Sequence, residues 1–155
     1  MRKLVLVLAL LAALSLPAMP ARAEGFALGF FLGEPTGLDL KLDLQRRSAL
    51  DVVLGITSIR YRNPLYAHLT YLLTPFMGQG QAVRVPLRIG IGAAVYGNSG
   101  DVNAGVRVPI ELGLWFRRTP LEIYGELALL LTLIDANDNY NRLDAQGGVG
   151  LRFYF

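Results

Sequence analysis

Two carboxylates, Glu111 and Glu126, have the spacing in this chain that points most directly to chemistry. They lie on two alternating segments that are joined by Arg117–Pro120. If these segments form an antiparallel hairpin, Phe116 faces Leu121, and the same register places Glu111 beside Glu126. Two adjacent carboxylates serve as a general acid and base or mark a proton or ion path, but they repel each other unless cations neutralise them.

Arginines on the flanking segments are the predicted partners of this carboxylate pair. Pairing on the same face brings Arg88 opposite Glu111 and brings Arg152 opposite Glu126. The four side chains then form a row across neighbouring strands, with charges in the order plus, minus, minus, plus. We interpret the network as structural, because buried charge must be paired wherever it lies. We predict no catalytic, cofactor-binding or metal-binding residue. The predicted interior charge network comprises Arg88, Glu111, Glu126, Arg152, Lys41 and Asp51.

His68 and Thr70 form a second candidate, because they share one face of a predicted strand. A histidine with a hydroxyl two residues later is similar to the His/Ser arrangement of the outer-membrane lipid A deacylases. Here threonine replaces serine, the companion motif is missing, and the alternation points the pair inward. We therefore interpret His68 as a histidine that is hydrogen-bonded inside a polar interior.

Two loop motifs have simpler interpretations than ligand binding. The stretch 135–139 begins like a calcium loop, but Tyr140 stands where that loop needs glycine, and Gln146 stands where it needs an acid. Arg60 and Arg62 could contact lipopolysaccharide phosphates, or they could be ordinary solvated arginines. The sequence has no phosphate-binding glycine loop, nucleophile elbow or zinc-ligand spacing.

Alternation of apolar and polar residues predicts the elements that position these side chains. In 37–44, for example, leucines occupy the even positions, whereas Asp39, Lys41 and Asp43 occupy odd ones. This period of two is typical of strands. Eight such segments are expected, at 25–33, 37–44, 49–57, 65–73, 85–95, 104–116, 121–133 and 146–155.

The expected connections are short and rich in turn-forming residues. Those after even-numbered strands would lie on one side of a barrel, and the others on the opposite side. Pro109 falls inside a strand, where its missing N–H predicts a bulge or a locally broken ladder. The predicted connections include Thr74–Ala82, Tyr96–Asn103 and Asp135–Asp144.

The N-terminus predicts export. A short basic start precedes Leu4–Leu16, an apolar run of 13 residues, and Ala21-Arg22-Ala23 has the small-x-small pattern of a cleavage site. We predict a signal peptide over 1–23 and a barrel domain over 24–155. Removing the signal peptide lowers the 15 basic residues to 12, which equals the 12 acidic residues. That balance gives no indication of nucleic-acid binding, and the absence of cysteine predicts no disulfide or thiolate site.

A closed membrane barrel accommodates this composition. Hydrophobic residues make up 53% of the chain and charged residues 17%, although no other apolar run approaches the length of a spanning helix. We therefore predict an all-β fold, an eight-stranded antiparallel up-and-down transmembrane β-barrel in the outer membrane of a diderm bacterium. Leu151, Phe153 and Phe155 have the form of a C-terminal signal for the outer-membrane insertion machinery. That machinery and outer-membrane lipid are the predicted partners.

The order of several short motifs resembles a family of small, secreted, uncharacterised proteins regarded as outer-membrane-type β-barrels. The resemblance lies in 33–41, 106–110, 120–127 and 148–155 and spans nearly the whole mature chain. Family members tend to carry an acidic residue two positions after the histidine of the fourth strand, where this chain has Thr70. The resemblance implies the fold and leaves the biochemical role open.

The predicted function is a structural or membrane-organising role, without catalysis. A small transport or pore protein is the first alternative, and a lipid A-modifying enzyme is the second. A soluble periplasmic barrel is a further alternative. Ligand, oligomeric state and openness of the lumen do not follow from the sequence.

Overall fold

Strands account for most of the described chain. The computed structural model describes residues 25–58, 64–98, 101–135 and 142–155. The predicted signal peptide, Arg60 and Arg62 lie outside these ranges. The strands are β1 (Phe26–Glu34), β2 (Thr36–Gln45), β3 (Ser48–Ile56), β4 (Leu65–Gln79), β5 (Val83–Asn98), β6 (Asp101–Phe116), β7 (Leu121–Ile134) and β8 (Arg142–Tyr154).

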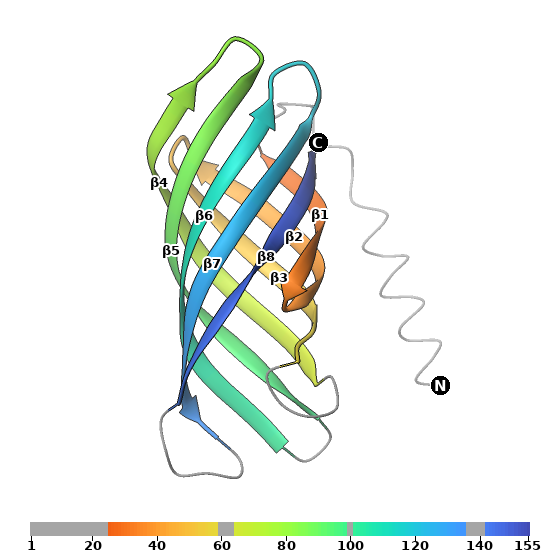
Figure 1. Cartoon of the computed structure of the whole chain (residues 1–155), viewed down its shortest axis with the longest axis vertical. Helices are drawn as coiled ribbons and strands as arrows, with labels where there is room; N and C mark the ends of the chain where they lie inside the picture. Colours follow the sequence, from red (N-terminus) through yellow and green to blue (C-terminus); the bar gives the residue numbers. More distant parts are fainter. Residues whose placement is uncertain (1–24, 59–63, 99–100, 136–141) are drawn as a thin grey trace, which may run out of the picture.

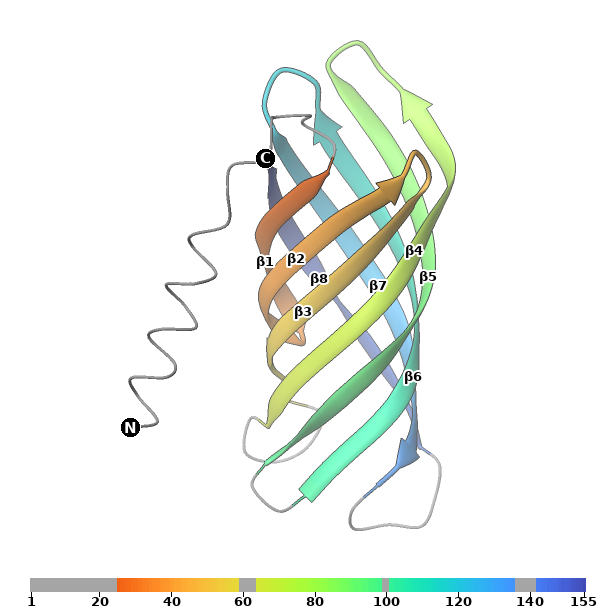
Figure 2. The same ribbon diagram turned by 180° about the vertical axis from the view of Figure 1, so that it is seen from behind.

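The strands form one closed barrel in chain order, as Figures 1 and 2 show. Each strand pairs antiparallel with its neighbours, and β1 closes the barrel by pairing with β8. Closure leaves no continuous sheet edge to be covered. The predicted all-β, eight-stranded antiparallel barrel is confirmed. Among the described residues, no helix is long and apolar enough to cross a membrane.

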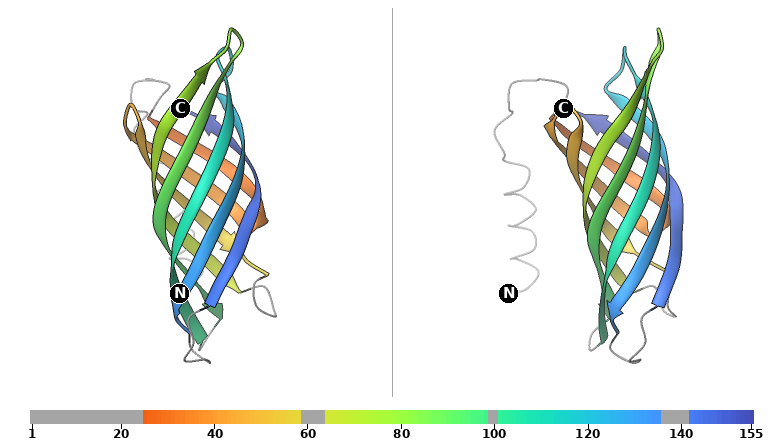
Figure 3. Two further views of the ribbon diagram at one scale, coloured as in Figure 1. Left: turned by 60° about the vertical axis from the view of Figure 1, so that its left-hand side comes forward. Right: turned by 90° about the vertical axis from the view of Figure 1, so that its left-hand side faces the viewer.

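The two ends of the barrel differ in what they carry, and the strands run obliquely between them (Figure 3). The turns after β2, β4 and β6 lie at the end that also carries Phe26 and Phe155, whose ring centroids are 6.2 Å apart. We call this the terminal end. Strands β1, β3, β5 and β7 finish at the opposite end, which we call the loop end. There Glu34 accepts a hydrogen bond from the backbone N–H of Ser58 at 2.9 Å and thereby joins two connections.

Side chains alternate between the two faces of the barrel wall, as the sequence predicts. On β7, Glu122 and Glu126 are buried in the interior, whereas Leu127 and Leu129 are exposed on the outside. The outer face carries large apolar side chains on every strand, represented by Phe30, Leu38, Leu54, Leu69, Ile91, Ile110, Leu127 and Leu151. The polar face is thus the inner one.

Pro86 on β5 and Pro109 on β6 interrupt the ladder between these two strands. Neither proline pairs across this seam, yet the residues around them, such as Leu87 and Leu112, keep one unchanged register. Proline has no N–H to donate, so a ladder position is lost wherever its nitrogen faces the neighbouring strand. The broken ladder predicted at Pro109 is confirmed, and it occurs without a bulge.

The fourth strand is longer than the alternation predicts. A connection is predicted over Thr74–Ala82, but β4 continues to Gln79. The register against β5 shifts between Leu73 and Phe76, around Pro75. A shift of this kind moves later side chains to the other parity, so a strict period of two ends there although the strand does not.

Strands also extend into the predicted connections at the loop end. Tyr96–Asn103 is predicted as a connection, but β5 and β6 pair within it, with Tyr96 opposite Asn103. The strand predicted from Gln146 begins at Arg142. Both extensions reduce the polar residues left to the connections.

Candidate functional site in the barrel interior

Arg152 on β8 is the centre of a charge network in the barrel interior, and its side chain is 0% exposed. Its Nε donates to Asp39 Oδ2 at 2.7 Å, and its Nη2 donates to Asp51 Oδ1 at 2.7 Å. Its Nη1 donates to both oxygens of Glu111, at 2.9 and 3.0 Å. The guanidinium carbon also lies 3.7 Å from the ring centroid of Tyr124. One cation therefore joins carboxylates from β2, β3 and β6.

Arg88 on β5 is a second buried cation in the same network. It donates to Glu111, its neighbour on β6, and lies 2.6 Å from Glu122 Oε1 on β7. Glu111 is therefore shared between Arg88 and Arg152. Glu122 lies opposite Arg152 in the β7–β8 register, with 4.0 Å between Oε2 and Nη1.

Lys41 extends the network toward the terminal end. Its Nζ donates to Asp43 and, at 3.1 Å, to the hydroxyl of Tyr154. Tyr154 in turn donates to Glu122 Oε2 at 2.5 Å. The ring of Tyr154 stacks on Trp115 with centroids 4.8 Å apart. Aromatic rings and charged groups thus occupy this part of the interior together.

Arg107 on β6 forms a second cluster, nearer the loop end. It donates to Glu126 on β7, and its Nε donates to Gln146 Oε1 at 3.0 Å. Gln146 also accepts a hydrogen bond from Tyr66 at 3.2 Å, and Tyr66 stacks on Tyr96 with centroids 6.3 Å apart. Contacts from β4 to β8 therefore cross the interior at this level.

His68 joins the two clusters. Its Nε2 lies 3.3 Å from Asp51 Oδ2, and its Nδ1 lies 3.4 Å from the hydroxyl of Tyr66. Polar contacts therefore continue from Lys41 near the terminal end through Arg152 and His68 to Arg107. His68 is 3% exposed, so the prediction that it is hydrogen-bonded inside the barrel is confirmed.

The ring of Tyr124 occupies the space that Gly150 leaves open by having no side chain. Tyr124 lies between Gly113 on β6 and Gly150 on β8, and a Cβ built at Gly150 would lie 2.1 Å from its ring. The ring stacks on Phe31 with centroids 5.9 Å apart, and the hydroxyl donates to Asp39. Glycine is therefore required at position 150 for the ring to lie along the wall.

The predicted pairings of Glu111 are confirmed. Arg88 lies opposite Glu111, and Glu111 lies opposite Glu126. The ion pair between Arg88 and Glu111 also forms. Lys41 and Asp51 lie opposite each other, but Lys41 binds Asp43 and Tyr154 instead.

The predicted pairing of Arg152 with Glu126 is wrong. Gly148 lies opposite Glu126, and Arg152 lies opposite Glu122, four residues earlier on β7. Arg107 neutralises Glu126 in its place. The register of β8 depends on the connection after β7, and turn chemistry does not fix the register across a connection of that length.

Four charged residues of the network are absent from the predicted set: Asp39, Arg107, Glu122 and Asp43. All four fall on the polar parity of their strands, so the alternation alone could have placed them in the interior. What the alternation could not give is the set of contacts across the lumen, because those depend on how the barrel closes.

The composition of the network indicates what it can do chemically. Among the described residues, four buried cations (Lys41, Arg88, Arg107 and Arg152) face five buried carboxylates (Asp39, Asp51, Glu111, Glu122 and Glu126). Each of these carboxylates lies within ion-pair distance of an arginine, and because the carboxylates outnumber the cations by one, several of them share an arginine. The described residues contain no group of three His, Cys, Asp or Glu side chains that could hold a metal ion. The arrangement is suited to filling and cross-linking the interior.

Comparisons with protein-family models, with curated proteins and with solved structures found no match to this chain. The fold and the interior network therefore define its class as a closed eight-stranded antiparallel barrel with a charged interior. The resemblance to the family of small secreted barrels stays a prediction.

Proposed function

We propose that this chain is an integral outer-membrane barrel of a diderm bacterium with a structural or membrane-organising role and no catalytic activity. The observation that carries the proposal is the reversed distribution of side chains. Ion pairs occupy the inside, whereas leucine, isoleucine, valine and phenylalanine cover the outside of every strand. Leu127, near the middle of β7, is 74% exposed.

Water is a poor solvent for that outer surface. Soluble monomers rarely expose a continuous apolar patch of more than a few hundred square ångströms, and here the apolar surface extends around all eight strands. Contact with lipid removes the free-energy cost of exposing this apolar surface to water. Closure of the barrel gives every strand two hydrogen-bonding neighbours, which satisfies the backbone groups that lipid cannot. The strands contain 9 to 16 residues, so each reaches at least the lower end of the roughly 9 to 11 tilted residues that a membrane strand needs.

The filled interior supports a passive role. An eight-stranded barrel has an interior about wide enough for side chains, and here arginines, carboxylates and tyrosines cross it. Folded protein in a planar lipid bilayer should therefore give no channel events. Reproducible conductance steps would replace this proposal with the pore alternative.

The lipid-modifying alternative would place catalytic groups where lipid can reach them. His68 and Thr70 are 3% and 0% exposed and face the interior. Expression of the chain should therefore leave the mass of lipid A unchanged. A mass change that is lost in His68→Ala would support an enzyme instead.

Fractionation tests the proposed location. We expect the folded chain in the outer-membrane fraction, extracted only with detergent, and with a gel mobility that changes on heating because the barrel resists detergent when unheated. Recovery of folded protein from the periplasm without detergent would contradict the proposal and favour a soluble barrel.

A further inference from the structure

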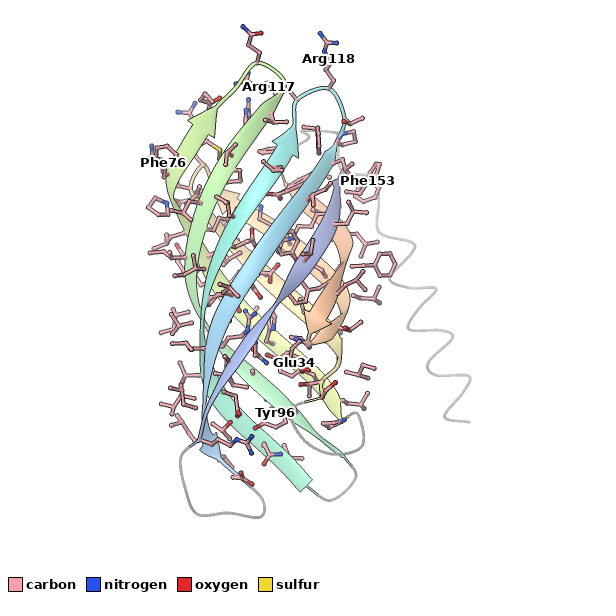
Figure 4. The ribbon with its side chains drawn as sticks, viewed as in Figure 1. Glu34, Phe76, Tyr96, Arg117, Arg118 and Phe153 are labelled. Carbon is pink, nitrogen blue, oxygen red and sulfur yellow. The ribbon has the colours of Figure 1, made fainter. Side chains whose placement is uncertain are left out.

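Exposed arginines gather at the terminal end of the barrel. Arg46 and Arg47 lie in the turn between β2 and β3, and Arg117 and Arg118 lie in the turn between β6 and β7. All four side chains are exposed, and Figure 4 shows Arg118 extending beyond the strands. The backbone carbonyl of Arg47 accepts a hydrogen bond from the N–H of Thr74 at 2.8 Å, which fixes the first turn against β4.

Acidic side chains near this end are bound within the barrel, and Arg117 donates from Nη2 to the neutral amide oxygen of Gln79 at 2.6 Å. Asp43 binds Lys41, with 20% and 3% of their side chains exposed, and Glu122 is 0% exposed. The loop end differs, because Arg142 there is paired with Asp144 at 2.9 Å. Among the described residues, the turns after β2 and β6 therefore carry exposed arginines, and neither they nor the turn after β4 carries an acidic side chain.

Aromatic side chains lie on the outer face beside the arginines. Phe26, Phe76, Phe153 and Phe155 are 42%, 62%, 47% and 60% exposed, and their positions at the start of β1, late in β4 and at the end of β8 place them in the half of the barrel nearer the terminal end. In Figure 4, Phe76 and Phe153 point away from opposite sides of the barrel, below the tip that carries Arg118. Aromatic rings followed by cations is the order expected where a hydrocarbon layer gives way to headgroups.

We propose that the terminal end binds the phosphate groups of anionic phospholipids, through Arg46, Arg47, Arg117 and Arg118. Guanidinium groups bind phosphate with two parallel hydrogen bonds and stay ionised at any physiological pH. The aromatic residues fix the depth of the barrel so that the arginines reach the headgroup layer. This inference rests on the proposed membrane location. It adds to that proposal the class of lipid that is bound and the leaflet that binds, which is the one at the terminal end.

Trp115 provides the measurement, because it is the single tryptophan of the sequence and lies near the terminal end, beside Arg84. Protein is folded into phosphatidylcholine vesicles that contain a trace of phosphatidylglycerol or, separately, of phosphatidylcholine, each labelled with dansyl on an acyl chain so that the headgroup keeps its own charge. We expect energy transfer from Trp115 to report an enrichment of the anionic probe by at least about twofold over the zwitterionic one. The preference should fall in 0.5 M salt, at a Debye length of about 4 Å.

Substitutions identify the groups responsible. The fourfold variant Arg46→Gln, Arg47→Gln, Arg117→Gln and Arg118→Gln should lose the preference, whereas the control Arg142→Gln at the loop end should keep it. Equal transfer to both probes in the original chain, or an unchanged preference in the fourfold variant, would overturn the inference.

Vesicle flotation and heat-modifiable mobility separate the two proposals. A chain that floats with vesicles and shows no probe preference contradicts headgroup binding alone. A folded chain that does not float contradicts the membrane location itself. The fourfold variant should float like the original chain, because none of its substitutions touches the apolar surface.

Discussion

Arg152 on β8 and Glu111 on β6 form a two-point ion pair that passes across the intervening strand β7, with donor–acceptor distances of 2.9 and 3.0 Å. The two residues lie on strands that are not paired with each other. Their ion pair therefore adds a constraint on the barrel that backbone hydrogen bonds between strands do not supply. Arg152 also binds Asp39 on β2 and Asp51 on β3, which lie beyond β1 on the other side of β8. The guanidinium therefore connects β8 with strands to which backbone hydrogen bonds do not join it.

Replacement of Arg152 by alanine should destabilise the barrel strongly. Asp39, Asp51 and Glu111 would lose a shared cation in a buried setting, and breaking a buried ion pair typically costs about 3–5 kcal/mol. Urea unfolding in lipid vesicles, followed by Trp115 fluorescence, gives the change. The matched control is Arg142→Ala, whose ion pair is 48% exposed on the arginine side and should cost about 0–1 kcal/mol. Equal effects of the two substitutions would contradict a central role for Arg152.

Arg107 and Glu126 should behave as a coupled pair. Arg107→Met leaves Glu126 buried without its cation, and Glu126→Gln leaves Arg107 without its anion, so each single change should destabilise by a few kcal/mol. The double variant should be more stable than the sum of the single effects predicts, because both charges leave together. A double-mutant cycle measures this coupling, and additivity within about 0.5 kcal/mol would show that the two groups do not act on each other.

Alternation and turn length account for most of what the sequence could predict. The period of two places every charged residue of the network on the inner face, and the short turn after Phe116 sets Glu111 opposite Glu126. The same reasoning fails for Arg152, because its register depends on the longer connection after β7. It also misses the contacts of Arg152 with Asp39, because a contact across the lumen depends on barrel closure and strand stagger.

Gly150→Ala should destabilise the barrel through Tyr124. The added Cβ would lie 2.1 Å from the ring, so the ring must leave its position beside Phe31 and Asp39. Overpacking of this kind costs about 1–3 kcal/mol. Gly125→Ala is the control on β7, because a Cβ there meets nothing within 4 Å and alanine suits a strand better than glycine.

The ring itself can be removed to test this assignment. In a Tyr124→Ala background, Gly150→Ala should cost much less than in the original chain, because the obstructing ring is gone. If Gly150→Ala lowers the free energy of unfolding equally in both backgrounds, the added Cβ does not act through the ring of Tyr124. Unfolding in vesicles measures both backgrounds under the same conditions.

Leu127→Arg distinguishes a lipid-facing surface from a water-facing one. Leu127 is 74% exposed near the middle of β7, opposite Ile110 of β6. An arginine at the midplane of a bilayer costs a membrane barrel about 2–4 kcal/mol, whereas the same substitution near the interface costs about 0–1 kcal/mol. Thr119→Arg, in the exposed turn between β6 and β7, is therefore the matched control.

Unfolding of both variants in vesicles gives the difference. We expect Leu127→Arg to lower the free energy of unfolding by about 2–4 kcal/mol and Thr119→Arg to leave it nearly unchanged. A barrel in water would give another result, because an exposed leucine packs against little and arginine is well solvated there. Near-equal stability of Leu127→Arg and the original chain would therefore show that the apolar outer face of β7 does not meet lipid.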